Sequence, residues 1–171
     1  MTKRICVLAD FHADTDTSDD RDYITKVGNF IASLQPDIII NLGDWWEFSS
    51  LSWFDRGQAK FYATSYKRDV ETGRQMMDLL FEPIYRRKRK MPERYFFMGN
   101  HEYRIERARQ TPGQVANMSE LLSLDDLELD QWYNNVIGYN GAAPGIVGIE
   151  GILFSHYFKD RAQAHLSLIH I

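Results

Sequence analysis

Hydrophobic and polar residues follow one another in blocks whose spacing changes from strand-like to helix-like along the chain. Three short apolar runs, rich in branched and aromatic side chains, predict strands that are buried on both faces. They are residues 4–9, 37–42 and 94–98. In residues 21–34 and 65–90 the apolar positions instead recur every three or four residues, which predicts amphipathic helices. Strands that alternate with helices indicate a layered α/β fold.

The second half of the chain has shorter periodic segments. Two short helices are predicted at residues 103–109 and 117–124. Short strands are predicted at residues 132–139, 146–149 and 152–155. Glycines recur among these strands and suggest hairpin turns. They are Gly138, Gly141, Gly145, Gly148 and Gly151.

Composition narrows the class of protein. The 171 residues, 44% hydrophobic and 26% charged, suit one globular domain with a substantial core. The net charge of −4 gives no general preference for nucleic acid, although a bound metal could supply positive charge that this count omits. Cys6 is the single cysteine, so we expect no internal disulfide and a reducing, cytoplasmic setting. No apolar run is long enough for a signal-peptide core or a membrane span.

Side chains that bind metals follow each predicted strand of the first half. Asp10 and His12 follow the first strand, Asp44 follows the second, and Asn100 follows the third. His156 comes directly after the later strand at residues 152–155. The carboxyl ends of parallel strands share one edge of a sheet, where α/β folds bind ligands. Carboxylate, imidazole and amide groups together favour divalent manganese, iron or zinc.

These residues carry a family resemblance. Asp10-Phe11-His12, Gly43-Asp44-Trp45-Trp46-Glu47, Gly99-Asn100-His101-Glu102 and His156 resemble, in order and spacing, the motifs of calcineurin-like metallophosphoesterases. The resemblance covers essentially the whole chain. It implies a two-layer sandwich of mixed β-sheets flanked by helices, with two divalent metal ions at the strand ends.

The resemblance also implies a role for each motif residue. Asp10, His12 and Asp44 would hold the first metal, with the Asp44 carboxylate bridging to a second. Asn100 and His156 would hold that second metal, and His101 would protonate the leaving group. Two bridged cations roughly 3.5–4 Å apart lower the pKa of a shared water to about 7 and orient a phosphate for in-line attack. An imidazole that donates a proton then assists departure of the alkoxide.

The chain departs from the family pattern in two places. Glu47 stands where Asp or Asn is more usual, at a position that is normally not a primary ligand. The last motif, Gly-His-x-His, has no counterpart, because His165 and His170 are the only late histidines and neither follows glycine. Residues 166–171, LSLIHI, resemble translated adapter sequence from a sequencing library. We therefore expect residues 1–165 to be an incomplete phosphoesterase domain that lacks its last strands, with weakened metal binding and little hydrolysis.

Other charged and aromatic groups have more than one interpretation. Arg104 and Arg107 lie three residues apart on a predicted helix, where they could clamp a substrate phosphate or pair with Glu102 or Glu106. Aromatic residues after the second motif could stack on a nucleobase, but a loop packed over the core is favoured. They are Trp45, Trp46, Phe48, Trp53 and Phe54. The basic run at residues 86–90 is typical of a solvated helix end.

The sequence therefore predicts a metal-dependent hydrolase of phosphate monoesters or diesters. Within the enzyme class, a DNA nuclease is the alternative, so nucleic acid stays open as a substrate. In a different class, a non-catalytic domain could keep the fold and the metal site for binding alone. Substrate choice depends on loops that the motifs do not specify.

Overall fold

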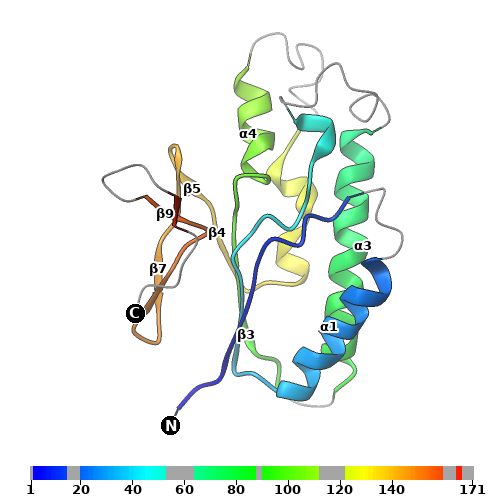
Figure 1. The fold of residues 1–171 in the computed structure, drawn as a ribbon, viewed down its shortest axis with the longest axis vertical. Coiled ribbons are helices and arrows are strands. Elements are labelled where there is room, and N and C mark those ends of the chain that lie inside the picture. The colour runs from blue at the N-terminus through cyan, green and yellow to red at the C-terminus, as the bar shows by residue number, and fades with distance from the viewer. Residues whose placement is uncertain are drawn as a thin grey trace.

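The computed structural model describes residues 2–14, 20–52, 64–87, 90–111, 122–159 and 165–166. Its centre is a parallel sheet with the strand order β1-β2-β3-β4. These strands are Ile5–Leu8, Ile38–Asn41, Glu93–Phe97 and Asn135–Ile137. The first two lie inside their predicted ranges, and β3 starts and ends one residue before the predicted 94–98. The parallel order brings their carboxyl ends to one edge, as the expected site requires (Figure 1).

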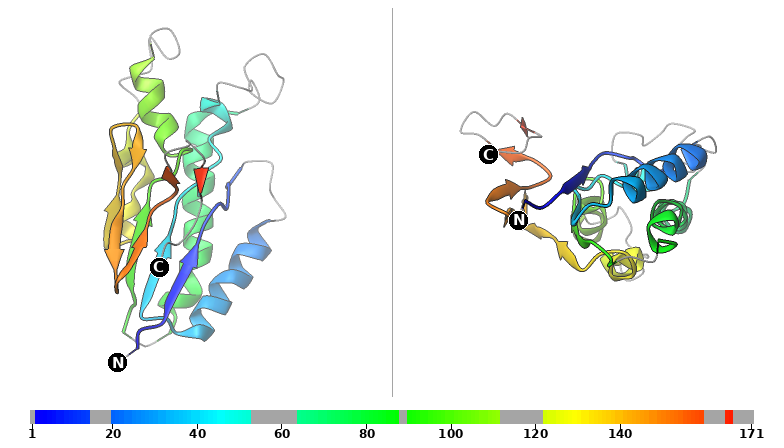
Figure 2. Two further views of the ribbon diagram at one scale, coloured as in Figure 1. Left: turned by 60° about the vertical axis from the view of Figure 1, so that its left-hand side comes forward. Right: turned by 90° about the horizontal axis from the view of Figure 1, so that it is seen from below.

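Helices cover one face of this sheet. They are α1 (Asp20–Leu34), α3 (Tyr66–Tyr85) and α4 (Tyr103–Gln110). Helices α1 and α3 lie side by side, and a large apolar cluster fills the space between them and the sheet (Figures 1 and 2). Helix α3 is shorter than the predicted 65–90, since it ends at Tyr85, two residues after Pro83. A proline inside a helix removes one hydrogen bond to the carbonyl four residues earlier and crowds the preceding turn, so Pro83 weakens the last turns of α3.

Short antiparallel ladders form a second layer on the other face (Figure 2). They pair β5 with β6, β7 with β8, and β9 with β10. Their bounds are Tyr139–Asn140, Ala143–Pro144, Val147–Ile149, Ile152–Phe154, Phe158–Lys159 and His165–Leu166. Ile149 and Phe154 pack against Ile38 and Ile40 in a second cluster, while Ile39 between them faces the helices. The apolar run of β2 is therefore buried on both faces, as predicted.

Some local expectations need correction. Gly148 lies within β7 rather than in a turn, whereas Gly141 and Gly151 do occupy hairpin turns with positive φ. The predicted helix at 117–124 falls largely outside the described residues. Its last residue instead starts the short 3-10 helix η3 (Leu124–Leu127), and a second, η4 (Leu129–Gln131), follows.

The aromatic residues after β2 belong to the core. Trp45, Trp46 and Phe48 are all 0% exposed, so they cannot stack on a ligand, and the favoured core interpretation is confirmed for them. Trp53 and Phe54 lie outside the described residues. The 3-10 helix η1 (Ser49–Leu51) follows this aromatic segment directly. No helix in the described part of the chain is long and apolar enough to cross a membrane.

Candidate metal centre

The loops after β1 and β2 pair with each other and carry much of the candidate site. The backbone N–H of Asp10 donates to the Gly43 carbonyl at 3.1 Å, and that of His12 donates to the Asp44 carbonyl at 3.0 Å. Asp10, His12 and Asp44 all have positive φ values, between 49° and 56°. Side chains other than glycine rarely adopt this left-handed conformation, and such strain collects at functional sites. The three candidate ligands therefore stand on backbone that the tertiary fold has to hold in place.

Two glycines let the loop after β2 approach the loop after β3. A Cβ on Gly99 would lie 2.2 Å from Oδ1 of Asp44, and one on Gly43, at φ +95°, would lie 2.4 Å from the Gly99 nitrogen. Both distances are far below van der Waals contact, so neither position accepts a larger residue without displacing the loops. The glycines of the second and third motifs thus allow Asp44 and Asn100 to come together.

The first group of candidate ligands contains Asp10, Asp44 and His156. One ligand atom from each lies within 4.8 Å of the others. The His156 Nε2 atom is 3.4 Å from Asp44 Oδ2 and 2.9 Å from Asn100 Oδ1. Residues from four separate segments of the chain therefore converge at one edge of the sheet.

His156 tests whether these residues suit a cation. Its Nδ1 atom lies 2.8 Å from the Leu42 carbonyl oxygen, while Nε2 faces the oxygens of Asn100 and Asp44. In this arrangement, with oxygens on both sides of the ring, a proton or a metal ion at Nε2 satisfies the oxygens of Asn100 and Asp44. Burial alone would lower the pKa of His156, but the Asp44 carboxylate outweighs it and raises that pKa above its usual value. The donor set of this group therefore fits a divalent cation.

Asp44 has the electrostatics of a ligand that stays ionised. Its side chain is only 6% exposed, and burial acts to raise its pKa. His156 and His101 outweigh burial and hold the pKa of Asp44 below its usual value. The Oδ1 atom also accepts the backbone N–H of His101 at 2.8 Å, which orients the carboxylate. Asp44 thus presents a fixed negative charge between the two histidines.

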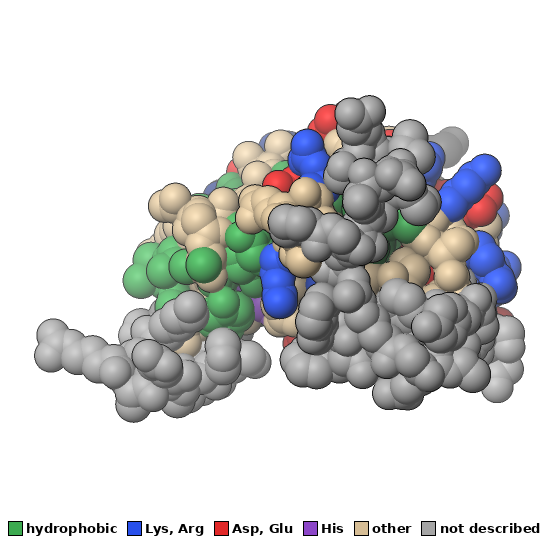
Figure 3. Space-filling model, turned by 90° about the horizontal axis from the view of Figure 1, so that it is seen from above, with side chains coloured by type: hydrophobic (Ala, Val, Ile, Leu, Met, Phe, Trp, Pro, Cys, Tyr) green, Lys and Arg blue, Asp and Glu red, His purple; other side chains and the backbone are tan. Residues whose placement is uncertain are grey.

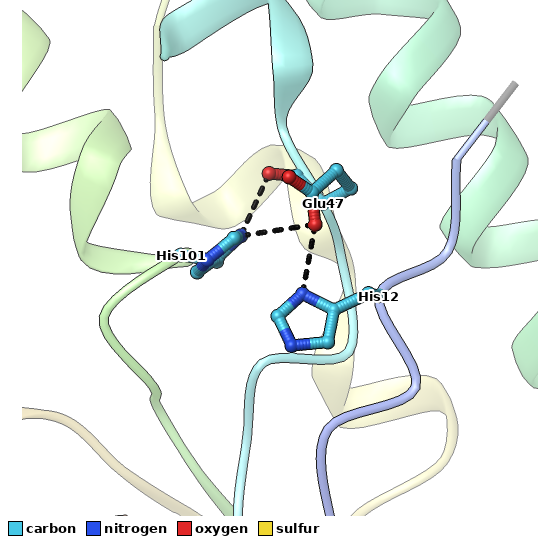
Figure 4. A group of neighbouring side chains, drawn as sticks. All are labelled: His12, Glu47 and His101. Atoms are coloured by element: carbon cyan, nitrogen blue, oxygen red, sulfur yellow. Dashed lines mark hydrogen bonds and ion pairs between the residues drawn. The ribbon is translucent and has the colours of Figure 1, made fainter. Parts of the chain in front are cut away.

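His12, Glu47 and His101 form a second group (Figure 4). The His12 Nδ1 atom lies 2.8 Å from Glu47 Oε2, and this hydrogen bond is the main reason that the pKa of His12 is raised. Since the carboxylate takes Nδ1–H, the other ring nitrogen of His12, Nε2, is left as the ligand atom. A metal-binding histidine typically has such an acceptor on its second nitrogen. The sequence did not predict this role of Glu47. Its position at the end of the second motif was the one feature that could have indicated it.

His101 has a different environment. Its Nδ1 atom donates to the Glu47 carbonyl oxygen at 2.8 Å, and Nη2 of Arg104 donates to its Nε2 atom at 3.0 Å. Because arginine is always a donor, this pairing requires a neutral imidazole. Burial lowers the pKa of His101, and the Arg104 charge lowers it further. If His101 is to protonate a leaving group from Nε2, the hydrogen bond from Arg104 to that atom would first have to break.

The two predicted substrate arginines lie differently. Arg104 donates from Nη1 to the carbonyl oxygens of Glu47 and Phe48, at 2.7 and 3.3 Å. It contacts the second group directly, and the predicted pairing with Glu102 or Glu106 is not what holds it. Arg107 is exposed on α4, and none of the cluster's hydrogen bonds or ion pairs among the described residues involves it.

Glu102 is a buried residue whose part in the site was not predicted. It is 0% exposed and accepts four backbone N–H groups through its two carboxylate oxygens. Burial, followed by the nearby Asp44 charge, raises the pKa of Glu102 to about 7. Four donors and no acceptor at these oxygens favour the ionised carboxylate. Its place as the last residue of the third motif was the signal in the sequence.

The edge that carries these groups is open in part. Figure 3 views the molecule from above and shows histidine surface in a hollow beside a cationic side chain and a patch of hydrophobic side chains. Asp10 is exposed and His12 is partly exposed, whereas His101 and His156 are each 8% exposed. A ligand can therefore reach the cluster from the side of the β1 loop.

Comparison with known proteins identifies the family of the chain. The family model of calcineurin-like phosphoesterases matches residues 3–164. The chain belongs to this family, and the predicted α/β fold is confirmed. The family's general activity is metal-dependent hydrolysis of phosphate esters. No curated protein matches the sequence significantly.

Proposed function

We propose that this chain hydrolyses phosphate esters, with low turnover, at a dinuclear metal centre of manganese, iron or zinc. In this proposal Asp10, His12 and Asp44 hold one ion, and Asp44, Asn100 and His156 hold the other. The observation that carries the proposal is the convergence of Asp44, Asn100 and His156, with oxygens facing both nitrogens of the His156 ring. Oxygen and nitrogen atoms that face one another in this way are typical ligands of a divalent cation.

The bound ions would supply Lewis-acid charge at the phosphoryl oxygens and acidify a water molecule. The remaining steps belong to side chains of this chain. Asp44 keeps its negative charge between the two histidines, and Glu47 holds Nδ1 of His12 so that Nε2 faces the centre. His101 would give the proton from its Nε2 atom to the departing oxygen.

Arg104 connects substrate binding to that proton. Its guanidinium group lies at Nε2 of His101, and its side chain is 18% exposed. An incoming phosphate oxygen would compete for Nη2 and draw it away from the ring, because arginine pairs strongly with phosphate. Nε2 would then be free to take up a proton from solvent, which it would pass to the leaving oxygen. Arg107, exposed one turn further along α4, stays a candidate for a more distant substrate contact.

Metal stoichiometry together with turnover tests the proposal. The purified chain is loaded with Mn²⁺, its bound metal is counted by mass spectrometry, and hydrolysis of 4-nitrophenyl phosphate, bis(4-nitrophenyl) phosphate and single-stranded DNA is followed. Two ions per chain with turnover, both lost in Asp44→Ala, would support the proposal. The choice among the three substrates would separate monoesterase, diesterase and nuclease activity.

The second candidate function is a domain that binds metal without catalysis. It is favoured by the Arg104 hydrogen bond that occupies Nε2 of His101. Under this alternative the chain would bind no more than one ion and hydrolyse none of the three substrates.

We also propose that the protein works in a reducing, cytoplasmic setting, which the free thiol of Cys6 supports.

A further inference from the structure

The Glu102 carboxylate lies between the loops that follow β2 and β3. Its Oε2 atom accepts the N–H of Asp44 at 3.0 Å and that of Gly99 at 2.7 Å. Its Oε1 atom accepts the N–H groups of Trp45 at 2.9 Å and Trp46 at 3.2 Å. One side chain thus satisfies donors from both motif loops, and Oε2 joins the two loops directly.

These contacts fall where the backbone most needs support. Asp44 has a left-handed φ of 50°, and Gly43 before it has a φ of 95°. Without an acceptor, the buried N–H groups of Asp44 and Gly99 would each cost free energy, because they are shielded from water. The Glu102 carboxylate removes that cost only while the loop keeps this conformation.

We propose that Glu102 is a positioning residue for the metal centre, which holds the Asp44 backbone against the third motif and so fixes the carboxylate relative to Asn100. The inference rests on the proposed function in that Asp44 and Asn100 are taken as metal ligands. Both carboxylate oxygens of Glu102 are occupied by backbone donors, so it acts through Asp44 and not as a ligand.

The geometry explains why only a carboxylate serves. A glutamine has nearly the same size, but it presents one acceptor oxygen and one NH₂ group that donates. In Glu102→Gln the amide would therefore turn its own donor toward two of the four N–H groups. Either the Asp44–Gly99 link or the Trp45–Trp46 pair would be lost.

Mn²⁺ affinity of Glu102→Gln, measured by isothermal titration, tests the proposal. We expect a loss of about 10- to 100-fold relative to the natural chain, the range found when partners behind metal ligands are removed. The matched control is Asp69→Asn, which changes another buried carboxylate, 2% exposed, that accepts the Ser50 N–H and hydroxyl. The control should keep the affinity of the natural chain. Equal affinities in all three proteins, or an equal loss in both variants, would overturn the proposal.

Amide hydrogen exchange in the metal-free natural chain provides a second measurement that does not need the variant to fold. The N–H groups of Asp44, Trp45, Trp46 and Gly99 should exchange slowly and together. Exchange as fast as that of open loop amides would overturn the proposal. If the natural chain binds Mn²⁺ but hydrolyses nothing, the proposed function fails while the Glu102 inference still stands or falls on affinity and exchange.

Discussion

The two histidines on either side of Asp44 show how one residue type takes opposite states within a single site. His156 faces oxygens through both ring nitrogens, and its pKa is raised. His101 faces an oxygen at Nδ1 but the Arg104 guanidinium at Nε2, and its pKa is lowered. The first environment favours a cation, and the second favours a neutral ring. In the proposed function, this difference assigns one side of the cluster to the metal and the other to substrate and proton.

Removing the carboxylate that both sides share should have the largest effect. Asp44→Ala deletes the proposed bridging ligand. Metal ions stabilise the charge of the transition state by several kcal/mol, and the variant would lose this stabilisation. We expect phosphoester hydrolysis to fall by about a thousandfold or more, with loss of bound Mn²⁺. Parallel measurement of turnover and metal content checks this. A variant that still binds two ions would place the bridge elsewhere.

Glu47 supports the metal side through His12, and its loss should be the next largest effect. Glu47→Ala removes the acceptor 2.8 Å from His12 Nδ1, so the ring loses its orientation. Mn²⁺ affinity should fall about 10- to 100-fold. Glu47→Gln is the control, because its amide oxygen can still accept the same N–H, and it should retain most of the affinity. Identical losses in both variants would mean that the charge, not the hydrogen bond, matters.

Arg104 contacts His101, and we expect its replacement to have a moderate effect on stability and on the pKa of His101. Arg104→Gln removes hydrogen bonds to His101 and to the Glu47 and Phe48 carbonyls. We expect the free energy of unfolding to fall by about 1–2 kcal/mol. The pKa of His101 should rise, since a positive neighbour is gone. Urea unfolding and NMR titration of the ring would show both changes, and an unchanged His101 titration would contradict the assigned contact.

The smallest expected effect is a pair of opposite pH dependences in the metal-free chain. A raised pKa means that His156 contributes stability that is fully present below its unfolded pKa of about 6.5 and is lost as the pH rises through the folded value. A lowered pKa means that His101 contributes stability that is present above about 6.5 and is lost as the pH falls.

Replacement of each ring separates the two. The destabilisation caused by His156→Gln should be greater at about pH 5.5 than at about pH 8, and that of His101→Gln should show the reverse. Urea unfolding of the chelator-treated chain at both pH values gives the comparison. Two variants with the same trend would show that the division of the cluster is wrong.

Much of the site could be predicted because its residues follow apolar runs. Hydrophobicity alone predicted the strands at 4–9, 37–42 and 94–98. Because these strands are parallel, their carboxyl ends lie at the same edge of the sheet. The approach of Asp44 and Asn100 follows from that rule, whereas His156 follows β8, an antiparallel strand of the second layer, and reaches the same edge because that layer packs on the central sheet. The ligand roles of the five motif residues, the proton-donor role of His101 and the non-native origin of residues 166–171 stay predictions. The five are Asp10, His12, Asp44, Asn100 and His156. Of the last segment, only Leu166 is described.

The amino-acid order by itself determined the α/β class, the ends of the central strands and the identity of the candidate ligands, since each depends on local hydrophobicity or on motif spacing. Tertiary structure alone decided which atoms the remaining side chains face. Arg104 contacts His101 and Glu47, Glu47 turns its carboxylate to His12, and Glu102 spans two loops. The Glu47–His12 and Glu102–Asp44 contacts join residues more than thirty positions apart, and Asp44 also stands on left-handed backbone, so no periodic signal in the chain reveals them. The Arg104–His101 contact joins residues three apart, but their spacing does not show which partner the guanidinium faces.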